Sequence, residues 1–132
     1  MKSEKLIWAV ALTLIATVQI AGATTTTWYV NGVSGSDTNN CLSAETACKT
    51  IKHAISLAHS GDSIMVAAAT YKENLTVGKS LNILGSGATT TIIDGGGIAT
   101  VVTISSSSAL VTLSKFTIRN GNSPSGTGGG IK

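Results

Sequence analysis

The 132-residue sequence carries little charge and few of the residues that usually perform chemistry. It has nine basic and six acidic residues, a formal net charge of +3, and its later Lys and Arg residues are dispersed along the chain. Nucleic-acid binding depends on clustered positive charge, so this mild and scattered excess predicts an ordinary solvated surface. We therefore expect no nucleic-acid partner.

Carboxylates are too sparse to predict an active site. Beyond the first few residues, five acidic side chains stand alone in the sequence: Asp37, Glu45, Asp62, Glu73 and Asp94. Glycoside hydrolases need two facing carboxylates, and polysaccharide lyases usually need a Ca²⁺ cluster with a nearby base. The nearest candidate for a ligand is Asp94, which three glycines follow, but Asp and Gly both favour turns. We predict no catalytic residue and no cofactor.

Other isolated polar residues have structural interpretations. Asp62, directly after Gly61, is expected to bond local backbone N–H groups at the start of a strand, and Glu73 is expected at a surface corner. The glycines at 126–130 lack the Lys-Ser or Lys-Thr of a phosphate-binding loop, and no helix is expected after them.

The first 23 residues have the three parts of a secretory signal. A basic start at residues 1–5 precedes an apolar stretch at 6–20, and Ala21, Gly22 and Ala23 supply the small residues that signal peptidase accepts. As a membrane anchor the run would be marginal, because a span needs about 20 apolar residues and no basic stop-transfer cluster follows. We expect cleavage after Ala23, a secreted or cell-surface location, and no membrane span in the mature chain.

Two cysteines, Cys41 and Cys48, are the only ones present. In the oxidising environment outside the cytoplasm they have only each other as partners, so a disulfide is expected. A bridge closing so short a loop stabilises a small domain by about 2 to 3 kcal/mol in the chain-entropy model. No metal site is predicted, because only His53 and His59 could add ligands and they fall near opposite faces of a predicted helix. There is no CxxC redox motif.

The mature chain begins with one strand and one helix. Trp28–Val30 has strand character, and turn-forming residues fill 31–40. From Thr50 to His59, apolar residues recur with helical spacing and share one face: Ile51, Ala54, Ile55 and Ala58. Gly61 is expected to end this helix, since glycine readily adopts the left-handed conformation found there.

After Asp62 the sequence predicts only short strands. Polar turn residues separate them: 63–66, 75–77, 80–84, 91–93, 101–104, 110–113 and 116–118. Pieces this short suit a solenoid better than a sandwich. Alternation would place Leu81 and Ile83 on one face and Asn82 on the other.

Two weak echoes suggest an internal repeat. Residues 75–85 align with 111–121 when one position is skipped, matching Ile83 with Ile118, and Gly95–Ile98 recurs as Gly128–Ile131. Both give a period of about 33 to 36 residues, in the range typical of stacked units. The alternative is chance repetition of common Gly and Thr.

The order of these features resembles the N-terminal region of exported bacterial right-handed parallel β-helix proteins of the pectin-lyase-like fold. The residues that carry the resemblance are Asp37, Cys41-Leu42-Ser43, Cys48-Lys49-Thr50-Ile51, Gly61-Asp62-Ser63-Ile64, Ala69 to Asn74, Ile83 to Gly87, Thr91 to Gly95 and Leu113 to Gly121. Ala69 departs from the family, which usually has Gly there.

The resemblance implies an all-β, right-handed parallel β-helix with one short helical cap. Residues 24–61 would form a lead strand, disulfide loop and cap helix, and 62–132 the first coils of an incomplete solenoid. A secreted or cell-surface scaffold of the adhesin kind is then expected, as a fragment without activity of its own, with polysaccharide or another surface component as partner. The alternative is the N-terminal part of a polysaccharide lyase or glycoside hydrolase whose catalytic coils are missing. An open last coil could also support self-association.

Overall fold

The computed structural model describes residues 22–132. The predicted signal peptide, 1–23, lies outside the described residues except for Gly22 and Ala23. Within residues 22–132, no helix has the length and apolar character needed to cross a membrane.

The described chain consists of short strands and one helix. In chain order these are β1 (Thr27–Val30), α1 (Ile51–Leu57), β2 (Ser63–Val66), β3 (Ala69–Lys72), β4 (Leu75–Val77), β5 (Leu81–Gly85), β6 (Thr91–Asp94), β7 (Val102–Ile104), β8 (Val111–Ser114) and β9 (Thr117–Arg119).

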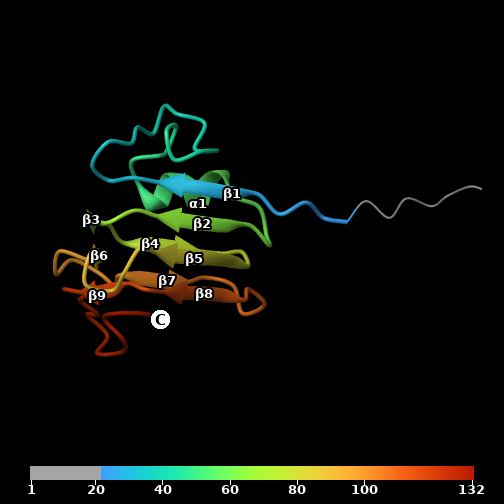
Figure 1. The fold of residues 1–132 in the computed structure, drawn as a ribbon. Coiled ribbons are helices and arrows are strands. Elements are labelled where there is room, and N and C mark those ends of the chain that lie inside the picture. Colours follow the sequence, from blue (N-terminus) through green and yellow to red (C-terminus); the bar gives the residue numbers. More distant parts are fainter. Residues whose placement is uncertain (1–21) are drawn as a thin grey trace, which may run out of the picture.

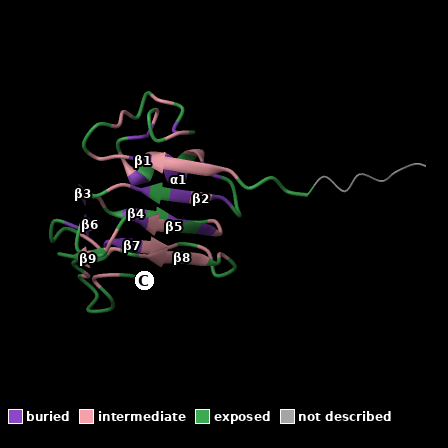
Figure 2. Ribbon diagram, viewed as in Figure 1, coloured by how far each residue is buried: buried purple, intermediate pink, exposed green. Residues whose placement is uncertain are grey.

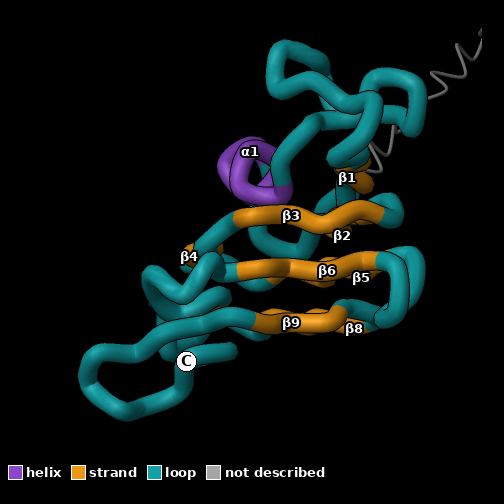
Figure 3. Tube along the Cα trace, turned by 90° about the vertical axis from the view of Figure 1, so that its left-hand side faces the viewer, coloured by secondary structure: helices purple, strands orange, loops and turns teal. Residues whose placement is uncertain are grey.

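The strands form three parallel sheets, ordered β1-β2-β5-β8, β3-β6-β9 and β4-β7. The chain visits the sheets in rotation, and we call one passage through them a circuit. Strands β2, β3 and β4 make one circuit and β5, β6 and β7 the next, so that each strand lies beside its equivalent in the circuit before (Figures 1 and 3). The described fold is therefore all-β, with parallel pairing throughout and one short helix.

Apolar side chains stack between successive circuits inside the sheets. The parallel register aligns Ile64 with Ile83 and Ile83 with Leu113, and both isoleucines are fully buried. In β5, Leu81 and Ile83 are buried while Asn82 is exposed, as the alternation predicts (Figure 2). Burying such columns removes apolar surface from water, which stabilises the stack.

Helix α1 covers the β1 end of the stack, opposite the C-terminus (Figure 1). The Thr50 hydroxyl accepts a hydrogen bond from His53 N, which caps the first turn. Ile51, Ala54 and Ile55 are buried, so the predicted apolar face is confirmed. The helix is shorter than predicted, because Ala58 is already extended. Gly61 does not end the helix; its φ of 99° serves the turn that leads into β2.

Most predicted strands are present with shifts of one residue, but β3 was missed. Its segment, Ala69–Lys72, lacks a run of β-branched residues and forms a strand by pairing with β6. Ala69 is absent from the residues with positive φ, so alanine at this position carries no backbone strain.

The predicted repeat register is wrong. Ile83 pairs with Leu113 instead of Ile118, and Ile131 bridges Val102 instead of stacking on Ile98. Loops of different length separate the strands, so Ser63 aligns with Asn82 but Leu81 with Val111. The strands from β2 to β8 therefore do not recur at a constant spacing in the sequence, and the two sequence similarities do not mark structurally equivalent positions.

Candidate functional site

The Cys41–Cys48 disulfide, predicted from the sequence, is present, with 5.0 Å between the two Cα atoms. Both cysteines are fully buried. Their backbone groups also satisfy β1, because Tyr29 N donates to Cys41 O and Cys48 N donates to Tyr29 O, each at 2.8 Å. The bridge thus fixes a loop that covers the edge of β1, which would otherwise present unpaired backbone groups.

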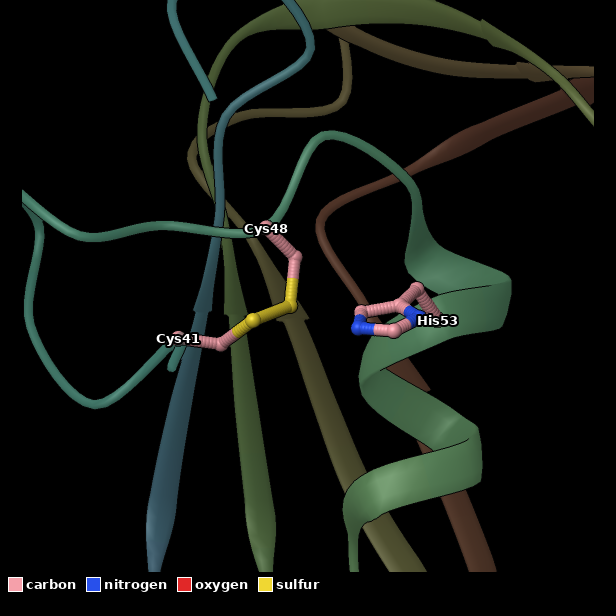
Figure 4. Close-up of side chains that lie close together, drawn as sticks. All are labelled: Cys41, Cys48 and His53. Carbon is pink, nitrogen blue, oxygen red and sulfur yellow. A yellow bond between two sulfur atoms is a disulfide. The ribbon is translucent and has the colours of Figure 1, made fainter. Parts of the chain in front are cut away.

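His53 lies beside the disulfide, an arrangement that the sequence analysis missed. The helix begins three residues after Cys48 and carries His53 in its first turn, with one ring nitrogen facing the sulfur atoms (Figure 4). One ligand atom from each of Cys41, Cys48 and His53 lies within 4.8 Å of the other two. His59 is exposed beyond the helix and is not part of this cluster, so the two histidines are not brought together.

Asp62 joins the start of β2 to the chain around β1. Its carboxylate accepts hydrogen bonds from Thr26 N at 2.8 Å, the Trp28 indole Nε1 at 2.9 Å and His59 N at 2.8 Å. The predicted local backbone bond is therefore present, and two long-range bonds are added. Burial alone would raise the pKa of Asp62, but the bonds from Trp28, His59 and Thr26 together hold it below its ordinary value.

Glu73 lies at the corner between β3 and β4, as expected, but it is only partly exposed and its carboxylate bonds the backbone of another element. Its two carboxylate oxygens accept from Ile51 N and Lys52 N, each at 2.9 Å, at the start of α1. The carboxylate thereby satisfies donors that the helix leaves free. Burial raises the pKa of Glu73 and outweighs the opposing effect of the bonds from Lys52 and Ile51.

Asp37 binds the two backbone N–H groups that come directly before those bound by Glu73. It accepts from Lys49 N and Thr50 N, each at 2.9 Å, and from the Thr50 hydroxyl. Burial favours a raised pKa for Asp37, but the bonds from Thr50 and Lys49 lower it overall. Glu45, the remaining acidic residue of the disulfide loop, is exposed.

Asp94, the nearest ligand candidate in the sequence, is fully engaged by neighbours. It accepts from Arg119 Nε at 2.8 Å, from Asn120 Nδ2 at 3.0 Å and from Gly96 N at 3.0 Å. The Gly96 bond makes the expected turn. Hydrogen bonds from Asn120, Gly96 and Arg119 lower its pKa. The carboxylate therefore links β6 to β9.

A hollow lies on the outer face of the β1-β2-β5-β8 sheet. Its floor is a row of side chains from three neighbouring strands, Tyr29, Met65 and Leu84, which the parallel register aligns. Ala44 and Ala47 of the disulfide loop form one wall. The hollow has a volume of about 210 Å³.

Two polar residues stand at this hollow, Asn31 and Ser86. The Asn31 side-chain oxygen accepts from Val33 N and Ser34 N at 3.0 and 3.1 Å, which fixes the side chain at the end of β1. Ser86 Oγ donates to Val66 O at 2.9 Å. A mostly apolar concavity with a few held polar groups is the usual form of a small-molecule site. We refer to it below as the outer hollow.

Comparisons with protein-family models, with curated proteins and with solved structures found no match to this chain. Any functional conclusion therefore rests on the sequence and on this geometry.

Proposed function

We propose that this protein is an exported, non-enzymatic scaffold that contacts carbohydrate through the outer hollow. Its architecture would be the N-terminal cap and first coils of a right-handed parallel β-helix. The rotation of the chain through three parallel sheets supports that architecture, as does the order of sequence features shared with pectin-lyase-like proteins.

The observation that carries the functional proposal is the outward row of Tyr29, Met65 and Leu84. These side chains face away from the core, and Met65 is 38% exposed. An aromatic ring with an exposed edge and a polar hydroxyl suits the mixed surface of a sugar, which has apolar C–H faces and a polar perimeter. The Asn31 amide and the Ser86 hydroxyl lie where they would meet that perimeter.

Export is supported by the sequence of the first 23 residues and by the disulfide. A buried bridge between the only two cysteines is compatible with an oxidising compartment. Mass measurement of the protein recovered from outside the cytoplasm should give a chain that begins at Thr24. Recovery of a chain that retains residues 1–23 inside the cell would contradict the export part of the proposal.

Carbohydrate contact is tested by affinity electrophoresis of the purified mature protein through gels that contain pectin, xylan or another soluble polysaccharide. We expect retardation in at least one gel, its loss in Tyr29→Ala, and its retention in Tyr29→Phe, which keeps the ring. Val33→Ala is the matched control, because Val33 is 78% exposed and does not line the hollow.

Circular dichroism should first show that each variant keeps the wild-type fold. Retardation that persists in Tyr29→Ala, or none with any polysaccharide, would overturn carbohydrate binding at the outer hollow. Release of reducing or unsaturated sugars from the same polysaccharides would instead favour the alternative, a polysaccharide-degrading enzyme.

A further inference from the structure

We propose that Cys41, Cys48 and His53 form a redox-dependent metal site, closed by the disulfide when oxidised and able to bind Zn²⁺ or a similar thiophilic divalent cation when reduced. This site is separate from the outer hollow and does not depend on carbohydrate binding.

The three side chains are already close enough to share an ion. In tetrahedral zinc sites, Zn–S bonds of about 2.3 Å and Zn–N bonds of about 2.0 Å place ligand atoms roughly 3.3 to 3.8 Å apart. Here one ligand atom from each residue lies within 4.8 Å of the other two. The Cα atoms of the two cysteines are 5.0 Å apart, so rotation of the freed thiol groups can create the required separation without moving the backbone far.

The third ligand is held in place by its helix. His53 N donates to the Thr50 hydroxyl at 3.2 Å, and Asp37 in turn accepts from that hydroxyl at 2.9 Å. One ring nitrogen of His53 faces the sulfur atoms (Figure 4). Among residues 22–132, neither ring nitrogen takes part in a hydrogen bond, so one of them is free to coordinate.

The surroundings favour a metal with one open position. Both cysteines are fully buried, whereas His53 is only partly buried, so solvent reaches the histidine that would supply the third ligand. Two thiolates and a neutral imidazole would supply three ligands, and water would supply the fourth. Two thiolates also balance the charge of a divalent cation, which lowers the cost of holding it away from bulk water.

The conversion balances with a dithiol as reductant. The dithiol gives two electrons and two protons to the Cys41–Cys48 bond and becomes a disulfide itself, and two thiols form in the protein. A divalent cation then displaces both thiol protons to the solvent as two metal–sulfur bonds form. Bound metal blocks re-formation of the bridge, so oxidation and metal loss are coupled.

The test uses Co²⁺, which reports thiolate coordination by its absorption. The mature protein is reduced with dithiothreitol, desalted without oxygen and titrated with Co²⁺ beside an unreduced sample. We expect one Co²⁺ per reduced chain, with sulfur-to-cobalt charge-transfer and tetrahedral visible bands, and neither in the unreduced chain. His53→Ala should weaken binding at least about tenfold, while His59→Ala, the matched control, should leave it unchanged.

Circular dichroism of the reduced chain distinguishes a site from a loosened chain. A native spectrum with Co²⁺ bound, or a lost spectrum that Co²⁺ restores, supports the proposal. A reduced chain that shows no charge-transfer band, that stays unfolded with Co²⁺, or that binds Co²⁺ equally well in His53→Ala overturns it.

Discussion

The β1 end of the molecule and the β8–β9 circuit are held in different ways. At the β1 end, side chains bond the backbone at many points. Lys79 Nζ, for example, donates to Ile55 O and Ala58 O at 3.1 and 2.6 Å where α1 ends. In the β8–β9 circuit, Leu113 and Ile118 are only partly buried. Strands β8 and β9 pair with β5 and β6, and the side chains of Arg119 and Asn120 bond Asp94.

The difference shows what covering the end of a parallel stack requires. Strands inside the stack satisfy their backbone groups with two neighbouring strands, whereas a loop or helix laid across β1 offers no regular ladder. Asp37, Asp62 and Glu73 supply acceptors for the donors left over. The isolated acidic residues of the sequence are therefore concentrated where the chain leaves regular pairing.

The largest contrast should come from two core substitutions. Ile83→Ala removes a fully buried side chain from the middle of the stack and should lower the free energy of unfolding by about 3 to 4 kcal/mol. Leu113→Ala, in the next circuit of the same column, should cost about half as much because the side chain is only partly buried. Urea unfolding measures both, and equal losses would show that the two circuits are packed alike.

Loss of the disulfide should be the next largest effect. Cys41→Ala with Cys48→Ala should reduce the free energy of unfolding by about 2 to 3 kcal/mol, because the bridge restricts the unfolded chain. Leu42→Ala, in the same loop but 52% exposed, is the control and should change it by less than about 0.5 kcal/mol. Urea unfolding measures the effect. A double variant as stable as the wild type would show that the disulfide does not stabilise the β1 end.

Asp62→Ala should cost about 2 kcal/mol, because it leaves three donors without their acceptor. Arg119→Ala should cost less, because its ion pair with Asp94 is half exposed. The loss should also depend on pH. The pKa of Asp62 is lowered by folding, so its stabilisation is present above its ordinary value of 3.8 and fades as the pH falls.

Urea unfolding at a series of pH values measures this loss. The difference between wild type and Asp62→Ala should narrow below about pH 4. A difference that stays constant down to acid pH would mean that the ionised carboxylate is not the acceptor that matters.

Glu73→Gln should give the smallest effect, with the opposite pH dependence. Folding raises the pKa of Glu73, so the folded protein binds the carboxyl proton more tightly than the unfolded chain does. The free energy of unfolding therefore falls as the pH rises from the ordinary pKa of 4.5 through the folded pKa. Gln does not titrate, so the variant should gain relative to wild type over that interval. Asp37→Asn is the control of sign: the carboxylate of Asp37 has a lowered pKa, so this variant should lose stability relative to wild type as the pH rises through that lowered pKa toward the ordinary 3.8, and the difference should stay constant at higher pH.

Local patterns in the sequence predicted many individual elements. The segments around β2, β4 and β5 combine β-branched residues with turn formers, and the helix has its apolar residues at helical spacing. These signals lie within a few residues of one another. Strand β3 and the role of Glu73 could not be found this way, because Ala69–Lys72 becomes a strand through β6 and Glu73 meets α1 across more than twenty residues of chain.

The two candidate sites also differ in whether local sequence was enough to predict them. Two cysteines in a chain expected to be exported were enough to predict their bridge, since neither had another partner. The outer hollow needed the register that aligns Tyr29, Met65 and Leu84, and circuits of unequal length hide that register from any search for a repeat.

The sequence by itself determined most of the short strands, the helix, the disulfide and the alternation of buried and exposed positions, because each depends on residues near one another or on a choice with one outcome. Only the tertiary structure decided which residues of successive circuits stack on one another and which donors the isolated carboxylates satisfy. It also decided that His53 faces the two sulfur atoms. Those relations join distant segments through space, and the lengths of the intervening loops, which no local preference fixes, set them.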